Sequence, residues 1–173
     1  MRIVAVSGKK QSGKTTLLEK LTVLLRERGL RVGVVKNDHH GFDMDQPGKD
    51  TWRLKQAGAA ATLIVGPERV GLVLDTPERP SLEEAAEAWL GGMDLVLAEG
   101  FSRSGVPKVE VFRSGAHDEP LLGPEDGLLA LATDDPDHAA VRAVREAGIP
   151  VFGLDDAASL ADLLLAGLLS NGK

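Results

Sequence analysis

A glycine- and lysine-rich segment near the N-terminus carries residue types that bind phosphate. Residues 8–15 read Gly-Lys-Lys-Gln-Ser-Gly-Lys-Thr and match the P-loop pattern G-x-x-x-x-G-K-[ST]. Glycine lets the backbone bend so that its N–H groups face the phosphates. Lys14 would reach the β- and γ-phosphates, and the Thr15 hydroxyl would bind Mg²⁺. The predicted phosphate-binding residues are Gly8, Lys9, Lys10, Gln11, Ser12, Gly13, Lys14, Thr15 and Thr16.

The context of this segment favours a P-loop over a lysine-rich turn that only caps a helix. An apolar run at residues 3–6 precedes it and is typical of a strand buried on both faces. Residues 14–28 place leucines at helical spacing before Gly29. The N–H groups and partial positive charge at that helix start would add to anion binding.

A second candidate group is an acidic residue for the magnesium ion. Glu99 ends the apolar run 95–98, and ligands of open α/β sheets bind at the carboxyl ends of strands. Glu99 would hold Mg²⁺ directly or through water, the alternative being a surface glutamate at a strand end. Asp45 and Asp50 are further metal candidates in the polar stretch after the expected strand 31–36, although Asp50 equally fits a helix N-cap.

A third candidate concerns the nucleotide base. Asp134 follows the apolar run 128–132, and a carboxylate there would accept hydrogen bonds from two adjacent guanine N–H donors, a pair that adenine lacks. The competing explanation for the neighbouring residues Asp134 and Asp135 is structural, because Asp135 before Pro136 is a good N-cap for a helix. Asp134 then remains available for guanine.

The elements needed to position these residues follow from the apolar pattern. Short apolar runs alternate with amphipathic stretches, which predicts an α/β protein with a three-layer P-loop NTPase fold: a mostly parallel sheet with helices on both faces. We expect one nucleotide-binding domain over residues 1–173. The expected strands are 3–6, 31–36, 62–65, 70–74, 95–98, 109–112, 128–132 and 151–154, and the expected helices are 14–28, 50–57, 81–90, 136–147 and 157–169.

Composition excludes several other classes of function. The net charge of −6 and the scarcity of aromatic residues argue against nucleic-acid binding, which depends on cationic surfaces and base stacking. The absence of cysteine excludes disulfides and thiolate zinc sites. The neighbours His39 and His40 point to opposite sides of an extended chain, so we interpret them as polar loop residues and not as metal ligands. The absence of a long apolar run or a signal sequence favours a cytoplasmic protein with no membrane contact.

Over almost its whole length the chain resembles the bacterial molybdopterin-guanine dinucleotide biosynthesis adapter protein B (MobB) family. The order and spacing of several short motifs carry this resemblance. The chain departs from the family at Asn37, which replaces the first histidine of the common family pattern Val-Lys-His-x-His-His. The matching motifs are Thr15-Thr16-Leu17 in the P-loop, Val35-Lys36 leading to His39-His40, Asp45, Pro47-Gly48-Lys49-Asp50, Ala57-Gly58-Ala59, Glu99-Gly100-Phe101, Pro107-Lys108 and Arg113.

The resemblance implies a homodimer that binds GTP with Mg²⁺ and is at most a weak GTPase. It would assist the guanylyltransferase that attaches GMP to molybdopterin, the pterin of the molybdenum cofactor. Lys14, Thr15 and Glu99 match the positions for phosphate and magnesium. Lys108 and Arg113 match family positions on a strand. They are candidate contacts of the pterin, a partner or the second subunit, the alternative being exposed charges on a strand.

No catalytic base or arginine finger is assigned from the sequence, which agrees with weak hydrolysis. Lys9 follows the first P-loop glycine, where dimeric switch ATPases carry a lysine that reaches the partner's nucleotide. The same role here is a hypothesis, the alternative being one more cation in an anion-binding loop. An ATP-dependent small-molecule phosphotransferase and a dimeric switch ATPase therefore stay open as alternative functions.

Overall fold

The computed structural model describes residues 2–170 and groups them into two compact units. The first, the sheet unit, comprises residues 1–37 and 82–173, and the second comprises residues 38–81. The candidate phosphate segment belongs to the sheet unit, so a single domain over 1–173 stays a prediction. No helix within residues 2–170 combines the length and the hydropathy that a membrane span requires.

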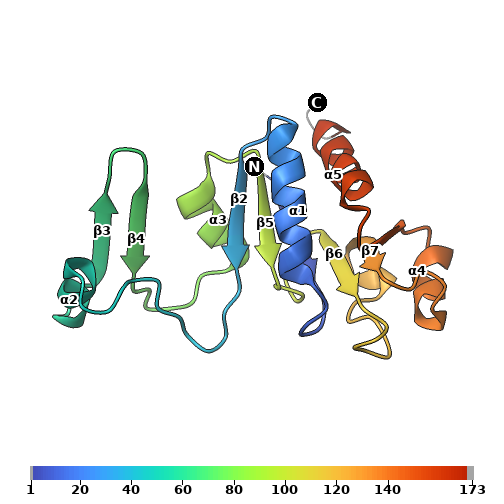
Figure 1. Ribbon diagram of the computed structural model, residues 1–173, viewed down its shortest axis with the longest axis horizontal. Coiled ribbons are helices and arrows are strands. Elements are labelled where there is room, and N and C mark those ends of the chain that lie inside the picture. The colour runs from blue at the N-terminus through green and yellow to red at the C-terminus, as the bar shows by residue number, and fades with distance from the viewer. Residues whose placement is uncertain (1, 171–173) are drawn as a thin grey trace. The chain divides into compact units, whose positions relative to one another are not determined.

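The sheet unit is built on six strands that all run parallel, in the order β2-β5-β1-β6-β7-β8. Figure 1 labels β2, β5, β6 and β7 of this sheet. The chain first builds one side of β1 with β2 and β5, and then crosses to the other side with β6. β1 is therefore the switch point of the sheet, where ligands of such sheets bind. The strands are β1 (Arg2–Ser7), β2 (Val32–Lys36), β5 (Leu95–Glu99), β6 (Lys108–Phe112), β7 (Leu128–Thr133) and β8 (Val151–Gly153).

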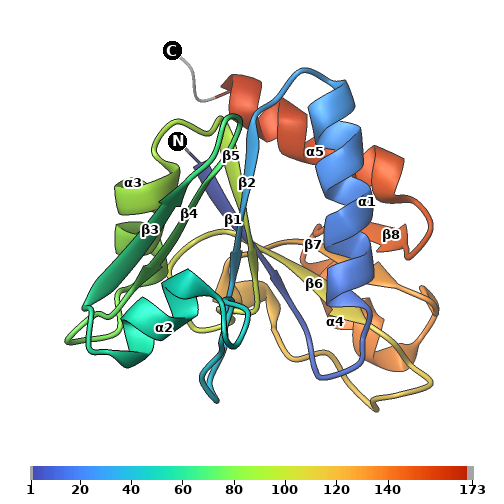
Figure 2. The ribbon, with the colours of Figure 1, turned by 60° about the vertical axis from the view of Figure 1, so that its left-hand side comes forward.

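Helices cover both faces of this sheet, because its central strands are apolar on both sides. Val4 and Val6 of β1 pack in one cluster with leucines of α1 (Lys14–Glu27) and α5 (Ala157–Ser170), which lie side by side (Figure 2). Ala5, between them in sequence, packs on the other face with Leu82 of α3 (Leu82–Leu90). The prediction of a three-layer α/β protein is confirmed.

The far end of the sheet packs against a short helical segment. Residues of β6 and β7 form a third cluster with Val141 and Val144, which lie in a 3₁₀ turn, η2 (Ala139–Val141), and in helix α4 (Arg142–Glu146). A second 3₁₀ turn, η1 (Pro124–Asp126), precedes β7. The order of elements thus follows the prediction, apart from the start of this helix.

The predicted helix 136–147 is wrong at its N-terminus, and Asp135 is not its N-cap. The Asp135 carboxylate accepts a hydrogen bond from the Asp137 N–H at 3.2 Å, which closes a turn instead. The helical segment begins after His138, whose Nδ1 accepts from the Ala140 N–H at 3.3 Å. The Asp135 carboxylate therefore closes this turn and does not cap the helix, although Pro136 after it suggested an N-cap.

The second unit consists of a polar stretch, a short helix and a β-hairpin. Helix α2 (Asp50–Gln56) precedes β3 (Ala61–Val65) and β4 (Val70–Leu74), which pair antiparallel. Lys55 joins helix and hairpin, because its ammonium donates to the Ala59 carbonyl at 2.9 Å and forms an ion pair with Asp75. Asp50 is not the N-cap of α2: the extended Lys49 takes that position, and Asp50 lies 3.7 Å from Arg53.

Candidate functional site

The candidate phosphate segment lies between β1 and α1, as the sequence predicts. Gly8 and Gly13 both adopt positive φ angles, of 138° and 102°, and Gln11 between them has φ 64°. Two of these three positions carry glycine, which alone adopts such angles without steric cost. Gly13 is also the N-cap of α1, so the unpaired N–H groups of the first helical turn lie at the end of the segment.

Gly8 is required by close packing as well as by its backbone angle. A Cβ atom at this position would overlap the Val111 carbonyl oxygen of β6 and lie 2.9 Å from the Ser12 hydroxyl oxygen. That hydroxyl is buried and has no hydrogen-bond partner among the described residues. Buried polar atoms without partners are rare, and one inside a ligand-binding loop points to a partner that the chain itself does not provide.

Lys14, the predicted phosphate cation, folds back onto its own loop. Its Nζ donates to the Lys9 carbonyl oxygen at 2.7 Å. Burial lowers the pKa of Lys14, and the nearby carboxylates of Glu99 and Glu110 oppose that shift. The ammonium therefore lies at the N-terminus of α1, on a carbonyl that a phosphate oxygen could replace.

Thr15 and Glu99 come together at the edge where β1 and β5 end. Glu99 is the last residue of β5 and pairs in register with Val6 of β1. The Thr15 hydroxyl donates to Glu99 Oε2 at 2.9 Å, and the Lys36 ammonium lies 3.7 Å from Glu99 Oε1. The carboxylate is thus held beside the first turn of α1, where the sequence predicts the magnesium ligands.

The chemistry of this pair fits magnesium. Mg²⁺ prefers oxygen ligands at about 2.0–2.1 Å in octahedral geometry, so two neighbouring ligands lie about 2.9 Å apart. Within residues 2–170 no cluster of three or more His, Asp or Glu side chains could hold a metal by itself. Mg²⁺ sites beside phosphates commonly take one or two protein ligands and complete the shell with phosphate and water, so Thr15 and Glu99 would suffice.

The remaining P-loop side chains are more exposed. Lys10, Gln11, Thr15 and Thr16 are exposed and Lys9 is half-buried. The Lys10 carbonyl oxygen lies 2.8 Å from His117 Nε2, a long-range contact. The nine predicted phosphate-binding residues form one continuous loop and helix start, and their contact with phosphate stays a prediction.

Sequence reasoning missed a segment that packs against the P-loop, residues 113–122. His117 contacts the loop at Lys10, and Glu110 holds the far end of the segment by accepting the N–H groups of Leu121 at 2.5 Å and Leu122 at 2.8 Å. Glu110 is 1% exposed, and burial raises its pKa, while the two backbone hydrogen bonds oppose the shift. A glutamate inside the apolar run Val109–Phe112 was the available signal, because a fully buried carboxylate needs partners.

Asp134, the predicted guanine contact, lies at the carboxyl end of β7. One of its oxygens, Oδ1, accepts the Ser114 N–H at 2.9 Å and lies 3.4 Å from the Ser114 hydroxyl. The exposed side chain therefore ties the start of segment 113–122 to β7, and the contact with guanine stays a prediction.

Lys108 has a structural role that its sequence context did not indicate. Its side chain is buried, and Nζ donates to the carbonyl oxygens of Val106 at 3.0 Å and Asp126 at 2.8 Å. These bonds compensate for burial of the ammonium and fasten the loop before β7 to β6. A pterin or partner contact of Lys108 stays a prediction, and it would require breaking this arrangement.

The second unit contains the other predicted polar residues. Asp45 Oδ1 accepts the Gln46 N–H and lies 3.0 Å from the Thr51 hydroxyl, and Asp50 is engaged with Arg53. His39 Nδ1 lies 3.4 Å from Arg79 in the same unit. His40 is exposed, and its backbone N–H donates to Asp38. Asp45 and Asp50 thus have local partners, and their role as metal ligands stays a prediction.

Comparison with known proteins places this chain in a family. Residues 3–134 match the model of the family described as Molybdopterin guanine dinucleotide synthesis protein B, MobB. The chain is 34% identical over 167 residues to the molybdopterin-guanine dinucleotide biosynthesis adapter protein of Escherichia coli (strain K12), covering 94% of this chain and 91% of that protein. The chain belongs to the MobB family.

Further members agree in sequence and in structure. The Haemophilus influenzae adapter protein is 38% identical over 135 residues, covering 78% of this chain and 75% of that protein. A crystal structure of molybdopterin-guanine biosynthesis protein B is 29% identical, covers 95% of this chain and 98% of its own, and has a TM-score of 0.73. The Bacillus subtilis MobB crystal structure is 28% identical with the same TM-score and covers both chains completely. These neighbours confirm the predicted P-loop NTPase fold and the resemblance to MobB.

Proposed function

We propose that this MobB-family chain is a GTP-binding adapter protein in the biosynthesis of molybdopterin guanine dinucleotide. It would assist the guanylyltransferase that joins GMP to molybdopterin, and act in the cytoplasm. The observation that carries the proposal is the hydrogen bond between Thr15 and Glu99 beside the P-loop. This bond joins the P-loop to a carboxylate that could bind Mg²⁺. The relatives of the chain are named as adapter proteins of molybdopterin-guanine dinucleotide biosynthesis.

The polyphosphate would bind along the segment from Gly8 to Thr16. Its oxygens would accept from the backbone N–H groups at the start of α1 and from the Lys14 ammonium, which would leave the Lys9 carbonyl. The unpartnered Ser12 hydroxyl supports this arrangement, because a polar occupant of the loop would satisfy it. Thr15 and Glu99 would hold Mg²⁺, which supplies charge neutralisation at the phosphates.

Base selection would fall to Asp134. Its Oδ1 is engaged with Ser114, so the carboxylate is already oriented at the carboxyl end of β7. The pair of N–H donors on guanine would find acceptors there, and adenine offers no such pair. Asp134→Asn should therefore reduce the preference for GTP over ATP.

Hydrolysis would be weak, because the carboxylates near the P-loop already have partners. Glu99 is bound by Thr15 and Lys36, and Glu110 by two backbone N–H groups. Neither is free to act as a general base on water. Lys9 remains the hypothetical source of charge for a nucleotide on a second subunit.

A homodimer is supported by the apolar surface of the hairpin. Leu63, Val65, Val70, Leu72 and Leu74 share one face of β3–β4 by register, and between 43% and 70% of each is exposed. Each outer edge of this two-stranded sheet also lacks a strand partner within residues 2–170. Such edges and patches are normally covered in stable proteins, and a second copy would cover them.

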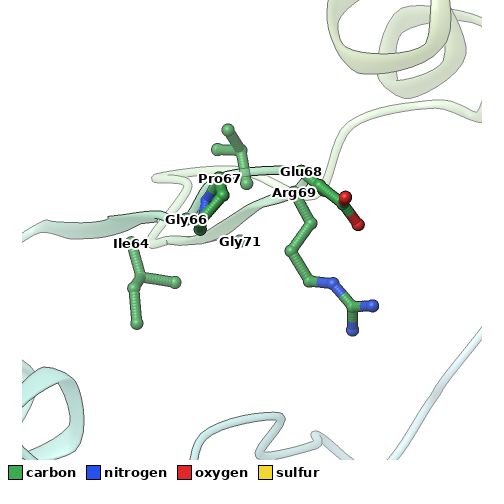
Figure 3. Close-up of a pocket in the computed structure, with 7 residues that line it drawn as sticks. Ile64, Gly66, Pro67, Glu68, Arg69 and Gly71 are labelled. Carbon is green, nitrogen blue, oxygen red and sulfur yellow. The ribbon is translucent and has the colours of Figure 1, made fainter.

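We do not assign the nucleotide to the pocket at the tip of this hairpin. It is lined by the turn residues and their neighbours, including Pro67, Glu68 and Arg69 (Figure 3). None of its lining residues belongs to the P-loop, and its walls offer no loop of backbone N–H groups at a helix start. The proposal therefore assigns the nucleotide to the switch point of the sheet.

Calorimetric titration with GTP and with ATP, each with Mg²⁺, tests the proposed function. We expect binding that prefers GTP and is abolished by Lys14→Ala, with Lys20→Ala on the same helix as the control. A preference for ATP would contradict the guanine assignment and favour a phosphotransferase or switch ATPase. A phosphorylated small-molecule product would single out the phosphotransferase, and ATP-dependent dimerisation would single out the switch ATPase.

A further inference from the structure

A cation that lies outside the P-loop approaches it from the end of β6. Arg113 is the first residue after β6, and one terminal guanidinium nitrogen, Nη2, lies 3.6 Å from the position that a Cβ atom on Gly13 would occupy. Gly13 is the N-cap of α1 and the second P-loop glycine. The guanidinium therefore lies beside the backbone that would carry the phosphates.

The guanidinium has no competing ionic partner in the part of the chain that the structure describes. None of the ion pairs among residues 2–170 includes Arg113, although 26 residues of the chain are acidic. Arg113 is an exposed residue, and its guanidinium lies beside a glycine at a helix start. An anion bound at that helix start would lie beside this guanidinium.

Long-range contacts hold the backbone of Arg113 in place. The next residue, Ser114, donates its N–H to Asp134 at 2.9 Å, which fastens the segment to β7. Further along, His117 Nε2 lies 2.8 Å from the Lys10 carbonyl oxygen in the P-loop itself. The Ala116 and His117 N–H groups both donate to the Arg113 carbonyl at 3.1 Å and close a turn immediately after it. Segment 113–122 is thus held by contacts with β7, with the P-loop and within its own turn, and these contacts fix the backbone of Arg113.

A guanidinium suits this position for chemical reasons. Its planar N–H groups can donate two parallel hydrogen bonds to one phosphate, while an ammonium acts as a point charge. Lys14 already supplies a point charge at the start of α1. The guanidinium of Arg113, which follows β6, would add a second charge and would also orient the phosphate. Because β5 and β6 flank β1 on opposite sides, Arg113 after β6 would approach phosphates bound after β1 from the side opposite Glu99.

We propose that Arg113 is a phosphate-binding residue, which supplies from the same chain a guanidinium to the polyphosphate of the bound nucleotide. Ser114 and His117 act as positioning residues for it. This inference rests on the proposed function, since it assigns a further ligand to the same nucleotide site. It places the arginine on the nucleotide and not on the phosphate of a pterin.

The test compares binding of Mg²⁺-GTP and of inorganic tripolyphosphate to the full chain and its variants. Arg113→Ala should weaken both ligands by roughly tenfold, the order expected for one exposed charge-assisted hydrogen bond. Arg113→Lys should recover part of the loss, because it keeps the charge without the fork. Arg145→Ala, which removes an exposed arginine from α4, is the matched control and should leave both affinities unchanged. Circular dichroism melting of each variant checks that it is folded.

The outcomes separate this inference from the proposed function. If Lys14→Ala abolishes binding and Arg113→Ala binds as tightly as the unchanged chain, the inference is overturned and the proposed function stands. If tripolyphosphate binds and GTP has no preference over ATP, the guanine assignment fails, and the Arg113→Ala result with tripolyphosphate still decides the inference. If neither ligand binds the unchanged chain, both are overturned.

A double-mutant cycle tests the positioning role of His117. If this imidazole acts by holding the segment that carries Arg113, His117→Ala should weaken tripolyphosphate binding in the unchanged chain and have little further effect beside Arg113→Ala. Additive losses would overturn the positioning role, because His117 would then act on the P-loop independently of the arginine.

Discussion

Thr15 and Glu99 lie 84 positions apart in the sequence and are joined by a 2.9 Å hydrogen bond at one edge of the sheet. Thr15 belongs to the first turn of α1, and Glu99 ends the strand next to β1. The parallel pairing of β1 and β5 brings these two residues together, because parallel strands end at the same edge. The pair therefore links the phosphate loop to the strand that would supply its acidic magnesium ligand.

Removing the carboxylate of this pair should uncouple nucleotide binding from magnesium. For Glu99→Gln we expect the gain in GTP affinity on adding Mg²⁺ to fall by about tenfold, the lower end of the loss seen when a metal site loses a supporting carboxylate. Binding without Mg²⁺ should change little. Calorimetry with and without Mg²⁺ measures both. Glu19→Gln, an exposed glutamate on α1, is the control, and an unchanged Mg²⁺ dependence in Glu99→Gln would contradict the magnesium role.

Gly8 should tolerate no side chain. Gly8→Ala would push a methyl group into the Val111 carbonyl oxygen at a φ of 138°, so we expect the free energy of unfolding to fall by about 2 kcal/mol. Gly105→Ala is the matched control, because a Cβ there meets nothing within 4 Å and the backbone angle is ordinary. Urea unfolding followed by circular dichroism compares the two variants. Equal stabilities would show that the P-loop backbone relaxes around the new methyl group.

The buried Glu110 should make stability depend on pH. Burial raises the pKa of its carboxyl above the value of 4.5 expected in the unfolded chain. The stabilisation linked to the protonated form is then fully present below about pH 4.5 and is lost as the pH rises through the raised pKa. The slope for one group is at most about 1.4 kcal/mol per pH unit.

Glu110→Gln isolates this effect, because the amide is similar in size and does not ionise. We expect the free energy of unfolding of the unchanged chain to fall relative to that of the variant as the pH rises above 4.5. Urea unfolding at a series of pH values measures the difference. Parallel curves for the two proteins would mean that the hydrogen bonds from Leu121 and Leu122 fully offset the cost of burying the charge.

The apolar hairpin face should control the oligomeric state. Leu72→Glu puts a charge among Leu63, Leu74 and their neighbours, and burying that charge in a dimer interface would cost several kcal/mol. We expect a dimer for the unchanged chain and a monomer for the variant by sedimentation velocity. Leu54→Glu, an exposed leucine on α2, makes the same chemical change outside the hairpin and should leave the dimer intact. A monomeric unchanged chain would rule out the homodimer.

The P-loop and the order of elements were predictable, because both depend on residues close together in the chain. A segment of nine consecutive residues that follows an apolar run and ends in the first turn of a helix has only local requirements. The position of Glu99 was also predictable, since a carboxylate that ends an apolar run is expected at the carboxyl end of a buried strand. Helix starts were less predictable. Asp135 and Asp50 both suit an N-cap, and each instead uses its carboxylate elsewhere, in a turn and beside Arg53 respectively.

From the chain alone, a P-loop pattern between a buried strand and a helix could be recognised. What surrounds that loop depends on how distant parts of the chain pack together. Arg113 and His117 approach it because β6 pairs with β1, a relationship that no spacing in the chain reveals. Lys108 is a residue type that is usually exposed, yet here it is buried, and the backbone carbonyls of Val106 and Asp126 accept hydrogen bonds from its ammonium. Such roles depend on which groups packing brings within hydrogen-bond distance, and packing is a property of the whole chain.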